Sequence, residues 1–366
     1  MIVSVVQSAI TLIIFFGMLG ALVVIHELGH FVTARLAHIR VLEFGLGFPP
    51  RARVLRSRGD TLYTLNWLPI GGFVRLEGED GDSQDPRSFV RARLLTKVLI
   101  LVAGVAMNVL LAFVIFFGIN WLASPTVALQ VRDVQADSPA RAAGIVLDDR
   151  IMAVNDTPFY FAISTTTPAA GDRLRAMAGQ TVRLEVVHAD GRHETITTTL
   201  RGADQLSTTK GALGIAFQAA LTGDYVGRPF GDALVAARDW TGQAFRLIAD
   251  GLGQLANSIV KHPTEAPPVT GPIGIAGQVG TVFWQQGVVF TLLLAGILSA
   301  NLALVNILPF PPLDGGRVAV LIIKAVAGER VSIRAERLTY LVGFVFLMTF
   351  LVWISFFDIT APGRGQ

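Results

Sequence analysis

Four long apolar stretches, separated by polar segments, dominate the hydrophobic pattern of the chain. They cover residues 4–37, 98–123, 283–308 and 338–357, and each has at least the roughly 20 residues that a helix needs to cross a bilayer. The pattern predicts four transmembrane helices. The first stretch is not expected to be a cleaved signal peptide, because it lacks a basic start and runs directly into ionisable residues.

The polar segments differ in pattern. Residues 38–97 contain short β-prone runs between glycines and prolines, which predicts a small β-hairpin region. Residues 124–221 contain runs that alternate apolar with polar positions, as half-buried strands do. Ser138-Pro139-Ala140 within this segment is typical of a helix start. We therefore expect a small α+β domain here, followed by amphipathic helices and a linker in 222–282.

These patterns predict the fold class, an α-helical integral membrane protein with a β-hairpin region and a separate α+β domain. The expected segments in chain order are a first span (1–37), a β-rich loop (38–97), a second span (98–123), the α+β domain (124–221), amphipathic helices with a linker (222–282), a third span with the motif after it (283–315), a loop (316–337), a fourth span (338–357) and a tail (358–366).

Charge distribution predicts the direction of the spans. Basic residues are concentrated in 38–97 and 316–337, and the positive-inside rule places both loops in the cytoplasm. The region 124–282 and both termini then lie outside, and the first and third spans end in the same leaflet. The net charge of +3 is small and the basic residues are scattered, so nucleic-acid binding is not expected.

The sequence His26-Glu27-Leu28-Gly29-His30 ends the first apolar stretch. Ionisable groups inside a transmembrane segment are costly and by default indicate a functional site. His26 and His30 would share one face of a helix, the spacing at which two imidazoles bind one zinc ion with Glu27 as general base. The chain has no cysteine, so a zinc site would use histidine and carboxylate.

Asp314 is the expected third zinc ligand. It follows Pro309, Pro311 and Pro312 at the end of the third apolar stretch, where the prolines must unwind the helix. It is also the only acidic residue between Glu265 and Glu329. The remaining histidines show no ligand spacing and are expected at the surface: His38, His188, His193 and His262.

With these motifs the chain resembles the site-2 protease family of intramembrane zinc metalloproteases, of the bacterial RseP type. The strongest matches are HELGH at 26–30 and Asn-x-x-Pro-x-Pro-x-Leu-Asp-Gly at 306–315. Weaker matches are Leu68–Val74 with Gly78-Glu79-Asp80, Gly271–Ile275, and Ala103–Asn108, in which Val105 replaces the usual proline.

The resemblance implies roles for individual residues. His26, His30 and Asp314 would bind Zn²⁺, Glu27 would activate water, and Asn306 would hold the substrate backbone or the developing oxyanion. Asn306 could instead be a polar residue that links helices by hydrogen bonding. The β-rich loop would dip back into the membrane beside the active site, where a sheet edge could hold an unwound substrate by strand addition.

The segment 124–221 is similar to a PDZ domain, with Ser138-Pro139-Ala140 and Gly144 followed by an Asp-x-Ile-x-x-Val-Asn pattern ending at Asn155. PDZ domains bind an extended peptide or a C-terminus at a sheet edge. The resemblance places the peptide-binding loop at Leu213, Gly214 and Ile215. The alternative is a packing module without a ligand.

The leading functional prediction is an intramembrane zinc endopeptidase of a bacterial inner membrane, with the PDZ domain on the periplasmic side and the active site toward the cytoplasmic leaflet. By resemblance, its substrates would be single-span proteins, such as anti-sigma factors or signal-peptide remnants, already cut outside the membrane. One alternative is a non-catalytic PDZ scaffold. The presence of Glu27 argues against it, because a scaffold would not need a general base. Another is a membrane-anchored zinc peptidase that removes misfolded proteins.

Overall fold

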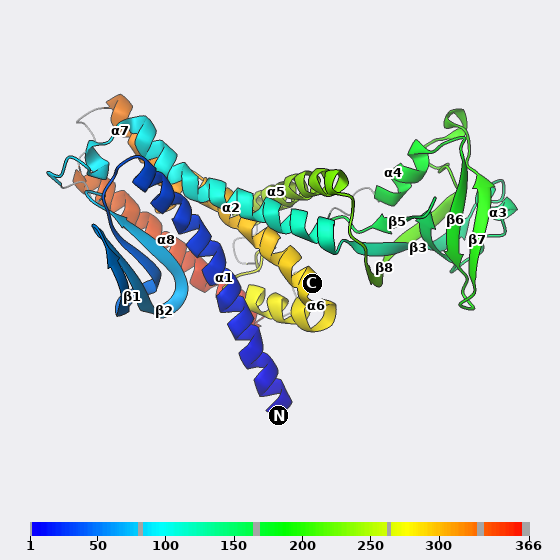
Figure 1. Ribbon diagram of the computed structural model, residues 1–366, viewed down its shortest axis with the longest axis horizontal. Helices are drawn as coiled ribbons and strands as arrows, with labels where there is room; N and C mark the ends of the chain where they lie inside the picture. The colour runs from blue at the N-terminus through cyan, green and yellow to red at the C-terminus, as the bar shows by residue number, and fades with distance from the viewer. Residues whose placement is uncertain (1, 80–82, 164–168, 262–264, 328–332, 361–366) are drawn as a thin grey trace. The chain divides into compact units, whose positions relative to one another are not determined.

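The computed structural model describes residues 2–79, 83–163, 169–261, 265–327 and 333–360 (Figure 1). The chain forms two compact units, one made of residues 1–116 and 244–366 and the other of residues 117–243. Most of the expected tail, and part of the expected linker at 262–264, lie outside the described residues.

In the described part of the chain, four helices are long and apolar enough to cross a membrane, as predicted. They are α1 (Ile2–Leu36), α2 (Leu94–Leu122), α6 (Pro272–Asn306) and α8 (Ile333–Thr360). Helix α6 begins well before the expected residue 283, inside the segment expected to be a linker. Its backbone leaves the helical region at Gly287, with φ of 81° and ψ of −169°. The continuous apolar stretch in the sequence covers mainly the part of α6 after this break, which is why the expected span began at 283.

A further helix, α7 (Asp314–Ala327), fills much of the segment 316–337 that was expected to be a loop. Basic residues such as Arg317 and Lys324 led to the prediction of a cytoplasmic loop here. In the structure these charges belong to an amphipathic helix, whose first turn buries Gly315 and Gly316.

The start of α6 is capped by a side chain from α8. The Asp358 carboxylate accepts hydrogen bonds from the backbone N–H groups of Gly271 at 3.0 Å and Gly274 at 2.9 Å. A Cβ at either glycine would collide with neighbouring atoms, including those of Ile354 or Asp358 itself. The Gly-Pro-Ile-Gly pattern therefore allows α8 to satisfy the free donors at the end of a neighbouring helix.

Strands β1 (Val41–Arg58) and β2 (Thr61–Leu76) form an antiparallel two-stranded sheet in the first unit, longer than the short runs in the sequence suggested. Both strands bend, so that the segment around Gly45 pairs with Phe73 on one side and Thr64 on the other. The buried Glu43 carboxylate is paired with Arg51 at 2.8 Å. The bends let the segment 72–76 run beside α1, which β2 contacts extensively.

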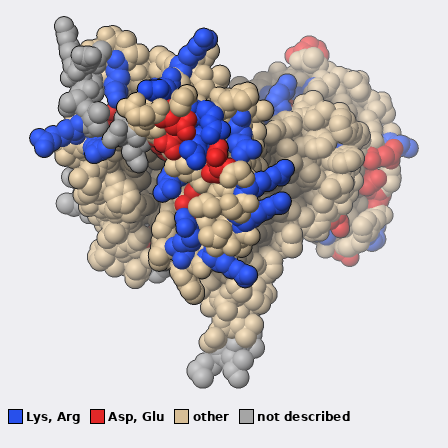
Figure 2. Space-filling model, turned by 60° about the vertical axis from the view of Figure 1, so that its left-hand side comes forward, with Lys and Arg blue, Asp and Glu red and all other residues tan. Residues whose placement is uncertain are grey.

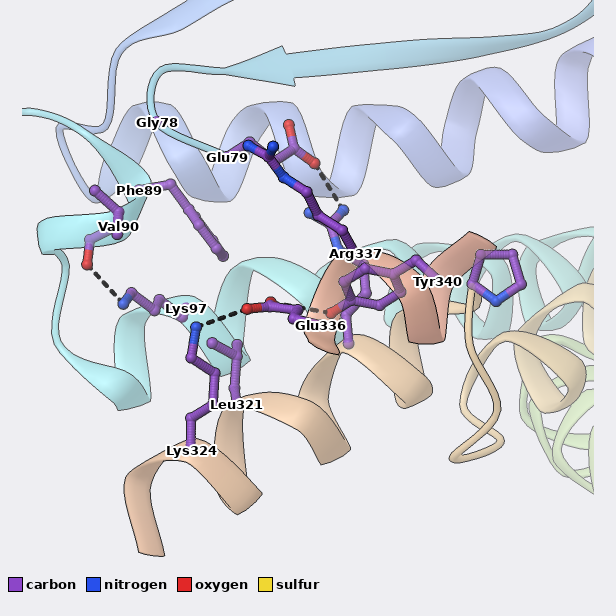
Figure 3. A pocket seen from close by; sticks show the side chains of 12 residues that line it. Gly78, Glu79, Phe89, Val90, Lys97, Leu321, Lys324, Glu336, Arg337 and Tyr340 are labelled. Atoms are coloured by element: carbon purple, nitrogen blue, oxygen red, sulfur yellow. Dashed lines mark hydrogen bonds and ion pairs between the residues drawn. The ribbon is translucent and has the colours of Figure 1, made fainter. Parts of the chain in front are cut away.

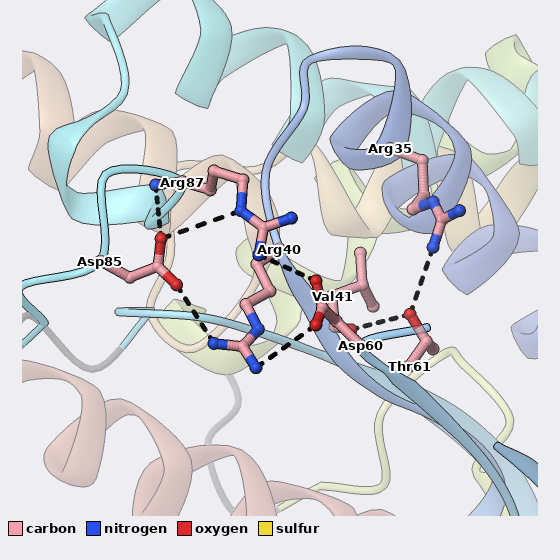
Figure 4. A network of polar contacts seen from close by, with 7 residues as sticks. All are labelled: Arg35, Arg40, Val41, Asp60, Thr61, Asp85 and Arg87. Atoms are coloured by element: carbon pink, nitrogen blue, oxygen red, sulfur yellow. Dashed lines mark hydrogen bonds and ion pairs between the residues drawn. The ribbon is translucent and has the colours of Figure 1, made fainter. Parts of the chain in front are cut away.

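A network of ion pairs joins this sheet to the segment that follows it (Figure 4). Arg40 pairs with Asp85 at 3.1 Å and with Asp60 at 3.4 Å, and Arg87 pairs with Asp60 at 2.9 Å. Nearby, Arg35 at the end of α1 donates to the Thr61 hydroxyl. These contacts fix the sheet to the end of α1.

The second unit is an α+β fold around a six-stranded sheet with strand order β7-β6-β4-β5-β3-β8. Its strands are β3 (Pro125–Val134), β4 (Arg150–Val154), β5 (Thr157–Tyr160), β6 (Thr181–Val187), β7 (His193–Thr199) and β8 (Ile215–Tyr225). The short α3 (Pro139–Ala142) starts as the sequence predicted, because the Ser138 hydroxyl accepts a hydrogen bond from the backbone of Arg141.

Helix α4 (Ala169–Ala176) also belongs to this unit, which buries residues such as Leu129, Ile151 and Leu184 in its core. The sheet ends at Tyr225, close to the expected boundary of 221. A single amphipathic helix, α5 (Phe230–Lys261), follows it along the chain.

His188, which was expected at the surface, is largely covered and lies between two carboxylates. Its Nδ1 is 3.0 Å from the fully buried Asp149, and its Nε2 is 2.9 Å from Glu194. Hydrogen bonds to Glu194 and then Asp149 raise the pKa of His188 above its usual value. The His188 side chain therefore links the start of β4 and the end of β6 to β7.

This arrangement predicts a pH-dependent stability of the second unit. Because the pKa of His188 is raised by folding, its contribution is complete below the unfolded value of about 6.5 and is lost as pH rises through the folded value. Hydrogen exchange of β4, β6 and β7 in the full chain should show weaker protection at high pH, and His188→Gln should remove this dependence. The matched control is His193→Gln at an exposed position. Equal pH dependence in wild type and His188→Gln would contradict the assignment.

Candidate metal centre and adjoining cavity

His26, His30 and Asp314, which are far apart in the sequence, meet inside the first unit. His26 and His30 lie one turn apart on α1 with exposed fractions of 7% and 8%, and Asp314 is the first residue of α7. Asp314 Oδ2 lies 2.9 Å from His26 Nε2 and 3.3 Å from His30 Nε2. The two Nε2 atoms are 3.1 Å apart.

The convergent atoms fit a bound cation better than they fit one another. Asp314 Oδ2 is buried and has no hydrogen bond of regular geometry. His30 Nδ1 faces the carbonyl oxygen of Ile100, so in the neutral imidazole the lone pair of Nε2 points toward Asp314 Oδ2 and His26 Nε2. Two imidazole nitrogens and a carboxylate oxygen are a common donor set for Zn²⁺ at a catalytic site.

Atoms behind the histidines orient their rings. His30 Nδ1 lies 2.8 Å from the carbonyl oxygen of Ile100, so Nδ1 carries the proton and Nε2 keeps its lone pair. His26 Nδ1 is 3.3 Å from the Asn108 amide nitrogen, while the buried Asn108 Oδ1 has no partner. Because the two ends of an amide are nearly isosteric, turning this amide lets Oδ1 accept from Nδ1 and frees His26 Nε2 for a metal.

Glycines provide the space for the two rings. A Cβ at Gly104 on α2 would lie 2.5 Å from His30 Nε2 and 2.8 Å from His26 Cε1. A Cβ at Gly29 would collide with the backbone of Ala103, so the two helices touch closely here. The sequence motif at 103–108 did not predict that Gly104 and Asn108 lie at the site. The two residues are four positions apart and so share one face of α2, which could have indicated a common contact.

Glu27 lies beside these groups at the wall of a cavity of about 120 Å³. One ligand atom from each of His26, Glu27 and His30 lies within 4.8 Å of the others. The cavity is also lined by Phe73 and Val74 of β2 and by Asp314. The sheet therefore runs along the open side of the carboxylate and imidazole cluster.

Arg317 closes another side of this cavity. Its guanidinium is paired with Glu79 at 2.7 Å, and Glu79 in turn accepts a hydrogen bond from the backbone N–H of Leu76. The pair therefore connects the end of β2 to the first turn of α7, which begins with Asp314.

The structure places the other predicted site residues elsewhere. Asn306 is the half-buried last residue of α6 and is not among the residues that line the cavity. Leu213, Gly214 and Ile215 belong to the second unit, where they line a groove of about 400 Å³ between α4 and the start of β8. Leu213 itself is in the core.

Comparison with known proteins gives the family. The model of Peptidase family M50 matches residues 14–350. Zinc metalloprotease RasP of Geobacillus kaustophilus is 26% identical over 98% of this chain and 99% of its own length. Proteins named as zinc metalloproteases in Clostridium perfringens and Nostoc are each 29% identical, covering 94% and 91% of this chain and 96% and 91% of theirs.

The match extends over nearly the whole chain and includes the helices long enough to cross a membrane. It also includes the histidine and carboxylate cluster described above. The chain belongs to Peptidase family M50, and it is a zinc metalloprotease of the membrane.

Proposed function

We propose that this protein is an intramembrane endopeptidase in which His26, His30 and Asp314 bind the zinc ion. The observation that carries the proposal is the meeting of their three donor atoms within about 3 Å, with Asp314 Oδ2 buried and otherwise unsatisfied. The two histidines lie on an apolar helix long enough to span a bilayer, so the chemistry would take place within the membrane.

The catalytic roles follow from the donor set. Zinc supplies Lewis acidity toward a carbonyl oxygen and lowers the pKa of water to about 7. The Glu27 carboxylate takes the proton of the attacking water and returns it to the departing amine. Ile100 and Asn108 hold the imidazoles in position during this exchange.

The substrate must be extended to be cut, because the peptide groups of a helix are already paired with one another. The segment of β2 at Phe73 and Val74 lines the cavity beside Glu27, and a Cβ at Gly72 would be 3.8 Å from Glu27 Cγ. We propose that this segment aligns the unwound substrate by strand addition. Asn306 does not line this cavity, so its proposed role, which comes from the family resemblance, is to hold a part of the substrate backbone outside it.

The proposed substrates are single-span membrane proteins of the anti-sigma factor or signal-peptide-remnant kind, after a first cut outside the membrane. The distribution of Arg and Lys supports a topology in which the active site faces the cytoplasmic leaflet of a bacterial inner membrane and residues 124–282 are extracytoplasmic.

We further propose that the second unit acts as a PDZ domain. Its groove lies between α4 and the end strand β8, and Leu213, Gly214 and Ile215 form the loop at its end. A peptide could pair with the free edge of β8 there. A scaffold without catalysis is less well supported, because Glu27 lies with the two histidines at the cavity.

Enlarging Gly104 should reduce zinc binding. In Gly104→Ala the new methyl group overlaps both imidazole rings, and displacing ligands in this way typically lowers metal affinity about 10–100-fold. Zinc per chain would be measured by mass spectrometry on monodisperse purified protein at a series of chelator concentrations, which gives the zinc affinity. The control is Gly118→Ala on the same helix, where a Cβ would have no heavy atom within 4 Å. Unchanged zinc affinity in Gly104→Ala would contradict the ligand set.

Removing the general base should abolish cleavage and leave the metal. Glu27→Gln is expected to keep about one zinc per chain while cleavage falls at least ~10²-fold. The assay uses vesicles and a tagged single-span protein without its outer domain. The control is Glu185→Gln, which changes an exposed carboxylate on β6 outside the cavity that Glu27 lines. Cleavage by Glu27→Gln at the wild-type rate would exclude this role.

Filling the groove of the second unit should weaken peptide binding. Gly171 on α4 lines the groove, and a Cβ there would be 3.6 Å from Phe217. Gly171→Leu should therefore lower the affinity for a fluorescent peptide with a free apolar C-terminus by at least ~5-fold. Ala176→Leu on the same helix is the control, because Ala176 does not line the groove. If both variants bind the peptide as the wild type does, the groove is not the peptide site.

A further inference from the structure

A second and larger cavity in the first unit adjoins the cavity of about 120 Å³ beside Glu27, which we call the catalytic cavity. It measures about 350 Å³ and is lined by the ends of α2 and α8 and by one face of α7 (Figure 3). We call it the basic pocket and define it by its charged residues: Glu79, Lys97, Arg317, Lys324, Glu336 and Arg337. In Figure 2, Lys and Arg side chains surround a smaller group of Asp and Glu on the face that comes forward.

The positive charges of the basic pocket are only partly neutralised. Arg317 pairs with Glu79 at 2.7 Å, and Lys324 pairs with Glu336 at 2.6 Å. Lys97 instead donates to the carbonyl oxygen of Val90 at 2.7 Å. Among the described residues, neither Lys97 nor Arg337 has a carboxylate within ion-pair distance. Within the described part of the chain, two cationic groups therefore line this cavity without a carboxylate at ion-pair distance, although Glu79 and Glu336 also line it.

The position of the basic pocket relates these charges to the membrane. Lys97 is in the first turn of α2, and Arg337 is near the start of α8. Both helices are long and apolar enough to span a bilayer, so the pocket lies where they leave it. Its wall combines the charges with the apolar surfaces of Phe89 and Leu321 and with Tyr340.

We propose that the basic pocket binds the phosphate headgroup of an anionic phospholipid. A phosphate diester accepts hydrogen bonds from ammonium and guanidinium groups at once, and basic pockets between transmembrane helices are suited to such headgroups. Phe89 and Leu321 provide apolar contact for the glycerol and the upper acyl chain. The location at the membrane surface favours a lipid over an acidic segment of another protein.

The proposed lipid site adjoins the catalytic cavity. Glu79, Phe89 and Arg317 line both cavities, and the Arg317–Glu79 pair forms part of the wall between them. A bound headgroup would add negative charge beside Arg317 and so compete with Glu79 for it. Lipid composition could in this way change the position of the end of β2, although binding itself does not depend on the proposed proteolysis.

Lipid titration followed by native mass spectrometry tests the proposal on the full chain in a neutral detergent. Phosphatidylglycerol, phosphatidylcholine and inorganic phosphate are compared as probes. The double variant Lys97→Gln/Arg337→Gln should bind phosphatidylglycerol about 25-fold more weakly, since each basic residue contributes a factor of about 5. Lys97→Arg/Arg337→Lys keeps both charges and should bind within about 2-fold of wild type.

The matched control is Arg93→Gln/Arg334→Gln, which removes two exposed charges from the same ends of α2 and α8 but outside the pocket. This control should keep wild-type affinity. The proposal is overturned if the control loses as much affinity as the pocket variant, since attraction would then be diffuse. It is also overturned if phosphatidylcholine binds as tightly as phosphatidylglycerol, or if inorganic phosphate binds and phosphatidylglycerol does not.

Discussion

The structure of the first unit depends on the approach of one carboxylate, Asp314, to two imidazoles of α1. Ion-pair distances of 2.9 and 3.3 Å require α7 to begin directly beside α1. Buried groups of this kind are costly without a partner, since each is removed from water. A zinc ion would satisfy all three donors at once, so binding of the metal should stabilise this arrangement.

Glycine makes this approach possible from several directions. A Cβ at Gly315 or Gly316 would overlap the backbone of 307–311, and one at Gly343 on α8 would overlap Pro311. The unwound segment after α6 is therefore enclosed by α7 and α8 without side chains between them. Gly104 plays the same part on α2, where the imidazole rings occupy the space of a side chain.

The sheet and an ion pair enclose the cavity beside this centre. The bend of β2 brings Phe73 and Val74 to the catalytic cavity, and Glu79 connects the end of that strand to α7 through Arg317. The helix that begins with Asp314 and the strand that lines the cavity are thus connected by one ion pair. In the second unit, the end strand β8 and the short helix α4 line a separate groove.

The sequence by itself determined the four apolar helices, the α+β character of residues 124–221 and the chemical nature of the His26, Glu27, His30 and Asp314 set, because spacing and hydropathy are local properties. Only the tertiary structure decided the helix at 314–327, the break at Gly287, the roles of Gly104 and Asn108 and the basic pocket. These depend on which backbones touch and which charges remain unpaired, and such contacts join residues that are distant in the chain.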